Sequence, residues 1–218
     1  MNAKSREELE DRLEEWRYAL ESRGLKISRE KTEYMTNGID DDLQATIRLG
    51  ETNIKRVQKF KYLGSTLDSE GEMDKETKHR VQSGWNNWRK VSGVLCDKRV
   101  PIKLKGKVHK AVVRPALTYG LEAAPLKKIQ EQKLDTAEMK MLRWMNGVTR
   151  KDKIRNTYIR GSSKVIEASR KVQEARLRWF GHLLRRPEEE HVASRTMEME
   201  IIGTRKRGRP KKRWKDCI

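Results

Sequence analysis

The sequence is poor in cysteine, and it has no long hydrophobic run. Its two cysteines, Cys96 and Cys217, lie far apart and outside any C-x-x-C pair, which excludes a disulfide framework and a zinc finger of familiar spacing. The longest apolar runs are a few residues, and the N-terminus opens with charged residues instead of a basic segment followed by an apolar one. We therefore expect a soluble chain, nuclear or cytoplasmic, that is neither secreted nor bound to a membrane.

Apolar residues are also scarce: they make up 35% of the 218 residues, and Leu, Ile, Val and Phe together about a fifth. This composition is near the range in which highly charged chains stay disordered. The six tryptophans argue against disorder, because each can bury a large apolar area. We expect one folded domain or two small ones, with a modest core for this length.

Positive charge is abundant, and the excess lies in the second part of the chain. Lys and Arg number 51 against 32 Asp and Glu, a net charge of +19. Residues 1–74 hold 13 basic and 17 acidic residues, a net of −4, which leaves +23 for residues 75–218. A soluble segment of this charge most often meets a phosphate backbone. A nucleic acid is therefore the expected partner.

The first part of the sequence predicts a helix and then short strands. The helix is expected from Ser5 to Gly24, because Ser5 begins a capping box and Gly24 suits the left-handed position after a helix. Four residues would form its apolar face: Leu9, Leu13, Trp16 and Leu20. Extended segments are expected at three places: Leu25 to Met35, Thr46 to Val57 with a turn at Gly50, and Phe60 to Leu67 before a turn at 68–71.

From about residue 72 onward the apolar spacing becomes helical. We expect one long helix over 73–95, a second beginning at Pro101, a third after Pro125, a linker over 146–156 and a fourth helix that carries Val165 to Leu183 and ends near Pro187. The predicted fold class is α+β: a small helix-plus-β-hairpin part followed by a mainly helical part.

Four stretches, taken in order, match the pattern of one protein family. They are Gly24 to Ser28 leading to Lys31-Thr32-Glu33, then Phe60 to Gly64, then Tyr119 to Glu122, and finally Arg178 to His182 with Gly208 to Trp214. In order and spacing they resemble the C-terminal half of reverse transcriptases from non-LTR (LINE-like) retrotransposons, over nearly the whole chain. One departure is Ala124, where that family usually has a tryptophan.

The resemblance implies four regions. These are the end of the palm with the primer-grip hairpin at 1–67, a helical thumb at 68–147, a helical C-terminal region at 148–203 and a basic tail at 204–218. It also implies an RNA template, a DNA primer and duplex DNA as partners.

The same resemblance implies that the polymerase centre is missing. In that family two adjacent aspartates and a third on an earlier strand bind the two metal ions of polymerisation, and the helix expected here over residues 5–23 corresponds to the one that follows the pair. The run Asp40-Asp41-Asp42 comes after Lys31-Thr32 where the family's pair comes before, so we interpret it as a solvated turn. We expect no polymerase activity and no cofactor in this chain, since Mg²⁺ would be needed only by the full-length polymerase.

Lys31 is the one residue for which the resemblance implies a catalytic role. The matching lysine in such polymerases is thought to protonate the pyrophosphate leaving group as a general acid. Without the metal site Lys31 has nothing to protonate, and a surface lysine beside a strand is the alternative.

The hairpin segment Phe60, Lys61, Tyr62, Leu63 and Gly64 is a candidate for contact with nucleic acid. Gly64 lets a backbone approach the sugar-phosphate, Lys61 can pair with a phosphate, and the rings can stack. The alternative is that Phe60 and Tyr62 are core residues of the hairpin.

For the other aromatic and histidine residues we expect structural roles. Core positions are expected for Trp85, Trp88, Trp144 and Trp179, because they lie at helical spacing with aliphatic residues. No metal site is expected from the histidines, which lack ligand-spaced neighbours and should be hydrogen-bonded or exposed: His79, His109, His182 and His191.

The tail is a cluster of basic residues that we expect to be unfolded when alone. The nucleic-acid-binding candidates are Arg205, Lys206, Arg207, Arg209, Lys211, Lys212 and Arg213. A general phosphate-binding role ranks first, while Arg207 to Pro210 also resembles an AT-hook core and the Lys-Arg run a nuclear localisation signal.

Three hypotheses follow from the sequence. The first is a reverse transcriptase fragment that binds template and primer without polymerising. The second is a standalone DNA- or RNA-binding protein derived from the thumb and tail, and the third is a gene fragment without function.

Overall fold

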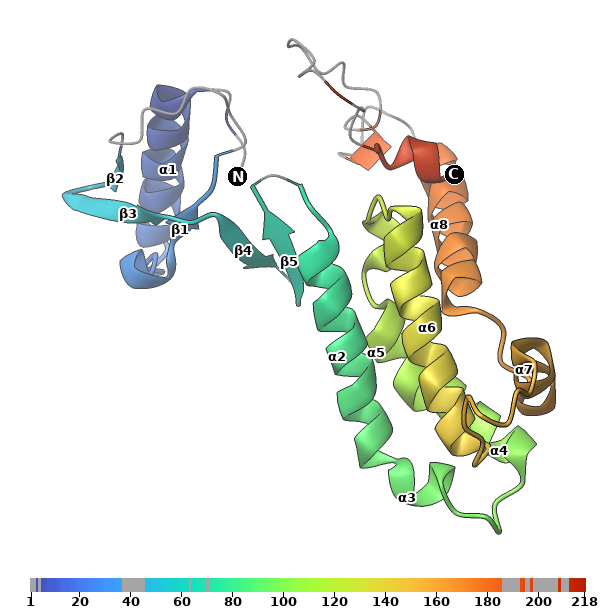
Figure 1. The fold of residues 1–218 in the computed structure, drawn as a ribbon. Helices are drawn as coiled ribbons and strands as arrows, with labels where there is room; N and C mark the ends of the chain where they lie inside the picture. Colours follow the sequence, from blue (N-terminus) through green and yellow to red (C-terminus); the bar gives the residue numbers. More distant parts are fainter. Residues whose placement is uncertain are drawn as a thin grey trace. The chain divides into compact units, whose positions relative to one another are not determined.

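The computed structural model spans residues 1–218 and describes residues 3, 5–36, 46–62, 64–69, 71–185, 193, 194, 197, 208 and 212–218. It confirms the α+β class, with helices beside one sheet of three strands and one of two (Figure 1). The chain divides into two compact units, Met1–Glu72 and Met73–Ile218. The second unit contains most of the expected thumb, from residue 73 onward, and the expected helical C-terminal region.

Helix α1 (Arg6–Glu21) begins where the sequence predicts. The Oγ of its N-cap residue, Ser5, accepts a hydrogen bond at 3.2 Å from the backbone N–H three residues on. Leu9 and Leu13 pack against the core of the first unit, whereas Trp16 is 59% exposed. The described residues therefore cover only part of the predicted apolar face.

Three short strands form the sheet of the first unit, in the order β1-β3-β2. They are β1 (Glu33–Tyr34), β2 (Ile47–Leu49) and β3 (Thr52–Arg56). β2 pairs antiparallel with β3 around Gly50, whose φ of +60° favours glycine, and β1 pairs parallel with β3. The core of this unit consists of Tyr34, Ile47, Leu49 and Ile54.

The strand expected from Leu25 to Met35 is mostly absent, and this prediction was wrong. A 3-10 turn, η1 (Arg29–Lys31), stands there instead, with β1 after it. The carbonyl of Ser28 accepts from the Oγ1 of Thr32 at 2.8 Å, and side-chain bonds of this kind compete with a strand ladder.

The second sheet is the predicted hairpin. β4 (Lys59–Tyr62) pairs antiparallel with β5 (Ser65–Asp68), and Gly64 between them has φ +82°. The turn expected at 68–71 is present, since the N–H of Gly71 donates to the carbonyl of Asp68 at 2.8 Å.

In the second unit, the long helix expected over 73–95 is two helices. α2 (Asp74–Lys90) ends at Val91, whose φ of −112° and ψ of 11° leave the helical region, and α3 (Ser92–Leu95) follows. Serine and glycine come next in sequence and both favour helix ends over helix interiors, which accounts for the break.

The helix expected from Pro101 changes its hydrogen bonding in the middle. Pro101 is the N-cap of α4 (Ile102–Val108), which continues into a π-helical segment, η2 (His109–Val113), and then α5 (Arg114–Thr118). Pro115 accounts for the wider turn, because it has no N–H to donate and its ring would clash with the carbonyl four residues earlier.

Further helices of the second unit are α6 (Lys128–Met145), α7 (Asn156–Ser163) and α8 (Ala168–Leu184). Two 3-10 turns, η3 (Leu121–Ala123) and η4 (Lys215–Cys217), accompany them. The sequence did not predict α7, and Val165 precedes α8 instead of lying in it. Within the described ranges no helix is long and apolar enough to cross a membrane.

The backbones of α4 and α7 approach each other very closely at Gly106. A Cβ built at this position would lie 1.8 Å from the carbonyl oxygen of Ser163. Only glycine fits there, so this residue fixes the distance between the two helices.

Two apolar clusters fill the second unit. The first contains Trp88, Leu95, Val113, Met139, Met141, Leu142, Met145, Ile159 and Val165. The second contains Leu117, Leu121, Ala124, Leu126, Leu134, Ala168 and Val172.

The tryptophans divide between core and surface. Trp88 is buried as predicted, and Trp85 packs partly buried against the first cluster. The prediction was wrong for Trp144, which is 63% exposed although its ring contacts both of those rings, with centroids 5.5 and 6.0 Å apart. Trp179 is also partly exposed and stacks on His182.

Candidate nucleic-acid interface

The hairpin presents two different faces, because side chains alternate along a strand. Phe60 and Tyr62 lie on one face with their rings stacked, at a centroid distance of 6.4 Å and an interplanar angle of 23°. Leu67 is paired with Phe60 across the ladder and is 46% exposed. Lys59 and Lys61 lie on the opposite face and are exposed.

This geometry bears on the core interpretation of the aromatic pair. Tyr62 is 58% exposed and Phe60 is half-buried, and neither ring joins an apolar cluster formed by described residues. The core alternative is therefore not supported, and the stacked rings form a platform open to solvent. Leu63 lies outside the described residues.

Lys31 occupies the end of the η1 turn and is exposed. Asp40, Asp41 and Asp42 lie outside the described residues. Among the residues that are described, no three His, Cys, Asp or Glu side chains gather in a way that could hold a metal ion. The catalytic role of Lys31 stays a prediction.

The end of the basic tail is folded, which corrects the expectation for residues 212–218. The Nε1 of Trp214 donates to the carbonyl of Glu122 at 2.7 Å, and the Nζ of Lys212 donates to the carbonyl of Leu126 at 2.9 Å. Lys212 therefore has a structural partner, whereas Arg213 is exposed. The other tail candidates lie outside the described residues: Arg205, Lys206, Arg207, Arg209 and Lys211.

Arg176 on α8 also contacts the folded end of the tail. It is 1% exposed and donates to the carbonyl of Ala124 at 3.0 Å and to that of Cys217 at 3.2 Å. The rings of Phe180 and Trp214 lie 6.2 Å apart. We call residues 212–218 with Arg176 the C-terminal clasp. The third stretch of the family resemblance and both parts of the fourth thus meet here.

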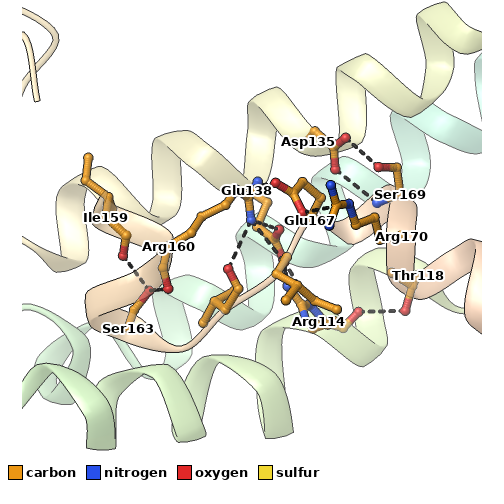
Figure 2. A network of polar contacts seen from close by, with 12 residues as sticks. Arg114, Thr118, Asp135, Glu138, Ile159, Arg160, Ser163, Glu167, Ser169 and Arg170 are labelled. Atoms are coloured by element: carbon orange, nitrogen blue, oxygen red, sulfur yellow. Dashed lines mark hydrogen bonds and ion pairs between the residues drawn. The ribbon is translucent and has the colours of Figure 1, made fainter. Parts of the chain in front are cut away.

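A second group of basic residues is buried around Glu138 (Figure 2). The two carboxylate oxygens of Glu138 pair with Arg114 at 2.6 Å and with Arg160 at 2.8 Å, and the carbonyl of Ile166 accepts from both guanidinium groups. Nearby, both the N–H and the Oγ of Ser169 bind the carboxylate of Asp135 on α6. These arginines join α5, α6 and α7 and are not available to a ligand.

His109 lies in the η2 segment and is fully buried, which corrects the expectation that it is hydrogen-bonded or exposed. Neither ring nitrogen has a hydrogen-bond partner within the described part of the chain. Burial is the main cause that lowers the pKa of His109 from its ordinary value of 6.5 to about 3, and the charges of Arg114 and Arg160 contribute to the same shift.

An exposed lysine stripe on α4 and η2 was missed by sequence reasoning. Lys103, Lys107 and Lys110 are exposed and spaced three or four residues apart, so they share one helix face. Lys105 falls on the opposite face, is buried, and donates to the carbonyl of Met145 at the end of α6, at 3.2 Å. The spacing of these lysines could have identified the stripe.

Comparison with known proteins gives one relative. A protein of Caenorhabditis elegans described as uncharacterized and transposon-derived is 25% identical over 206 residues, covering 89% of this chain and 72% of that protein. No protein-family model matches the chain, and no solved structure matches it. The similarity indicates a transposon-related origin.

Proposed function

We propose that this chain is a nucleic-acid-binding fragment of the reverse transcriptase of a non-LTR retrotransposon. The observation that carries the proposal is the distribution of positive charge. Residues 75–218 carry a net charge of +23. Buried structural contacts involve some of their basic residues, such as Lys105, Arg114 and Arg176, but these account for only a part of that charge. Exposed lysines such as those of the α4 stripe remain for phosphates.

The resemblance to the palm and thumb of such enzymes and the transposon-derived relative both support this assignment. The hairpin adds a second contact of a different kind. Its stacked rings offer an apolar platform to an unpaired base, and Lys61 on the other face offers a charge to a phosphate. The second unit would therefore bind the phosphate backbone of the nucleic acid, and the hairpin would bind the end of one nucleic-acid strand.

The test is a titration of the full chain with an RNA/DNA hybrid, an A·T-rich duplex and a G·C-rich duplex at two salt concentrations. Binding should be tight, similar for all three and strongly weakened by salt. Each phosphate contact steepens the slope of log affinity against log salt by about 0.9 on duplex DNA. Replacing Lys103, Lys107 and Lys110 by Gln should flatten that slope on every ligand, while the matched change Lys55→Gln, on the exposed side of β3, should leave it unchanged.

The hairpin is tested separately with a recessed primer-template end. Tyr62→Ala and Lys61→Ala should weaken binding to this end more than binding to a blunt duplex, because only the recessed end presents an unpaired strand. Equal losses on the two ligands would contradict the proposed role of the hairpin.

The tail is tested by substitution instead of truncation, because truncation would also remove the C-terminal clasp. Changing Arg205, Arg207 and Arg209 to Gln should flatten the salt slope without changing the preference among duplexes. An A·T preference that Arg209→Ala abolishes would instead identify an AT-hook.

Primer extension on poly-rA/oligo-dT with Mg²⁺ or Mn²⁺ should give no incorporation. The expectation rests on the need for carboxylates that fix two metal ions at the reacting phosphorus. Incorporation by a clean preparation would overturn the fragment assignment.

A further inference from the structure

A groove between α2 and α6 on the second unit has no part in the nucleic-acid interface proposed above. Its volume is about 560 Å³. Ala137, Val81 and Trp85 line it with side chains that are buried or half-buried. Lys78 on α2 and Lys133 on α6 also line it and are exposed. The groove thus has an apolar floor and basic edges.

The apolar surface continues along α6 in both directions. Ile129 at one end and Trp144 at the other are 58% and 63% exposed. They share one helix face with Lys133, Ala137 and Lys140, because these residues are spaced three or four apart. Two large exposed apolar side chains on one helix face are typical of a protein-binding surface.

Two contacts between α2 and α6 show how the helices run alongside the groove. The Nζ of Lys133 is 2.8 Å from the Oδ1 of Asp74, and the ring of Trp144 contacts that of Trp85. The two helices therefore run in the same direction over eleven residues, roughly 16 Å at 1.5 Å per residue. This length matches about three turns of a helix lying in the groove.

We propose that the groove binds an amphipathic helix of a partner protein, whose apolar side chains enter the groove and whose flanking Asp and Glu residues pair with the lysines at its edges. An amphipathic helix in an apolar groove is a recurrent mode of peptide recognition. Two lysines at the edges, Lys78 and Lys140, select acidic flanks by charge complementarity, while Lys133 pairs with Asp74 of the same chain.

A nucleic acid fits this groove less well. A phosphate backbone has no apolar side chains to cover Val81 and Ala137, whereas the exposed lysine stripe of α4 offers it charge without an apolar floor. The groove is therefore assigned to a protein partner and the stripe to nucleic acid, on different observations.

The test is fluorescence anisotropy of the full chain with a labelled helical peptide that carries Leu at i, i+3, i+4 and i+7 and Glu on both flanks. The acidic peptide should bind, and a version with Lys in place of Glu should not. Lys78→Glu together with Lys140→Glu should weaken binding at least tenfold. Trp144→Ala should weaken it as well, and since that side chain is exposed the variant should fold.

Lys103→Glu on α4 is the matched control and should leave peptide binding unchanged. Equal binding of the two peptides, or no loss on charge reversal at Lys78 and Lys140, would overturn the proposal. Displacement of the peptide by a DNA duplex, with the same substitutions weakening both ligands, would assign the groove to nucleic acid and also overturn it. A failure of the nucleic-acid titrations above would leave this result unaffected, because a different surface and ligand are measured.

Discussion

His109 is fully buried and has no hydrogen-bond partner among the described residues, and it should make the folded state sensitive to acid. Its pKa is about 3 in the folded chain and about 6.5 when unfolded. Because the folded pKa is lowered, the unfolded state binds more protons between these values, and stability falls as the pH drops from 6.5 towards 3. The loss from this one group between pH 7 and pH 4.5 is about 2.5 kcal/mol, at 1.36 kcal/mol per unit of pKa difference.

His109→Leu removes this proton-binding group and two unpaired buried nitrogens. At pH 7 the variant should be as stable as the parent chain or more so, because a buried donor and acceptor without partners cost about 1–3 kcal/mol each. Urea unfolding at pH 7 and pH 4.5 measures both effects. The variant should lose about 2.5 kcal/mol less than the parent on acidification, while the control His79→Gln, at an exposed position of α2, should lose as much as the parent.

Two results would refute the reasoning. If His109→Leu and the parent lose the same stability between the two pH values, His109 does not titrate as a buried neutral group. A stability loss of several kcal/mol at pH 7 would show that the ring nitrogens have partners.

Three further substitutions test the packing of the second unit by urea or thermal unfolding. Gly106→Ala should destabilise the second unit by about 3 kcal/mol or more, because the new Cβ would meet backbone. The control Gly161→Ala, in α7 with open space around it, should stabilise the unit by about 0.5–1 kcal/mol. A harmless Gly106→Ala would refute the close approach of α4 and α7. Glu138→Gln should cost about 3–5 kcal/mol, since it leaves the buried Arg114 without its carboxylate partner and leaves Arg160 only the more distant carboxylate of Glu167, at 3.7 Å. A neutral effect at pH 7 would argue against the buried pair. Trp214→Ala should lower the melting temperature and release the C-terminal clasp, seen as faster hydrogen exchange at its backbone amides; unchanged exchange there would contradict the clasp.

Local signals in the sequence were reliable guides to the elements. The cap at Ser5, the turn at Gly50 and the period of the long helices each depend on neighbouring residues only, and the structure has all three. The exposed or buried state of the hairpin rings could not be predicted, because alternation along a strand fixes which residues share a face but not which face is covered.

The roles of the basic residues depend on distant parts of the chain and were missed for that reason. Lys105 is bonded to a carbonyl 40 residues away, and Arg176 to one 52 residues away. Trp214 reaches a carbonyl 92 residues away, so the composition around it predicted an unfolded tail. Helix α7 is only eight residues long, and a helix of that length depends on tertiary contacts that no local pattern records.

The basic residues of the second unit fall into a buried set and an exposed set, and ionic strength should act on them differently. Counterions reach the α4 stripe but are excluded from the Glu138 pairs, whose side chains are at most 10% exposed. High salt should therefore strip bound nucleic acid from the protein during purification while its melting temperature stays nearly constant.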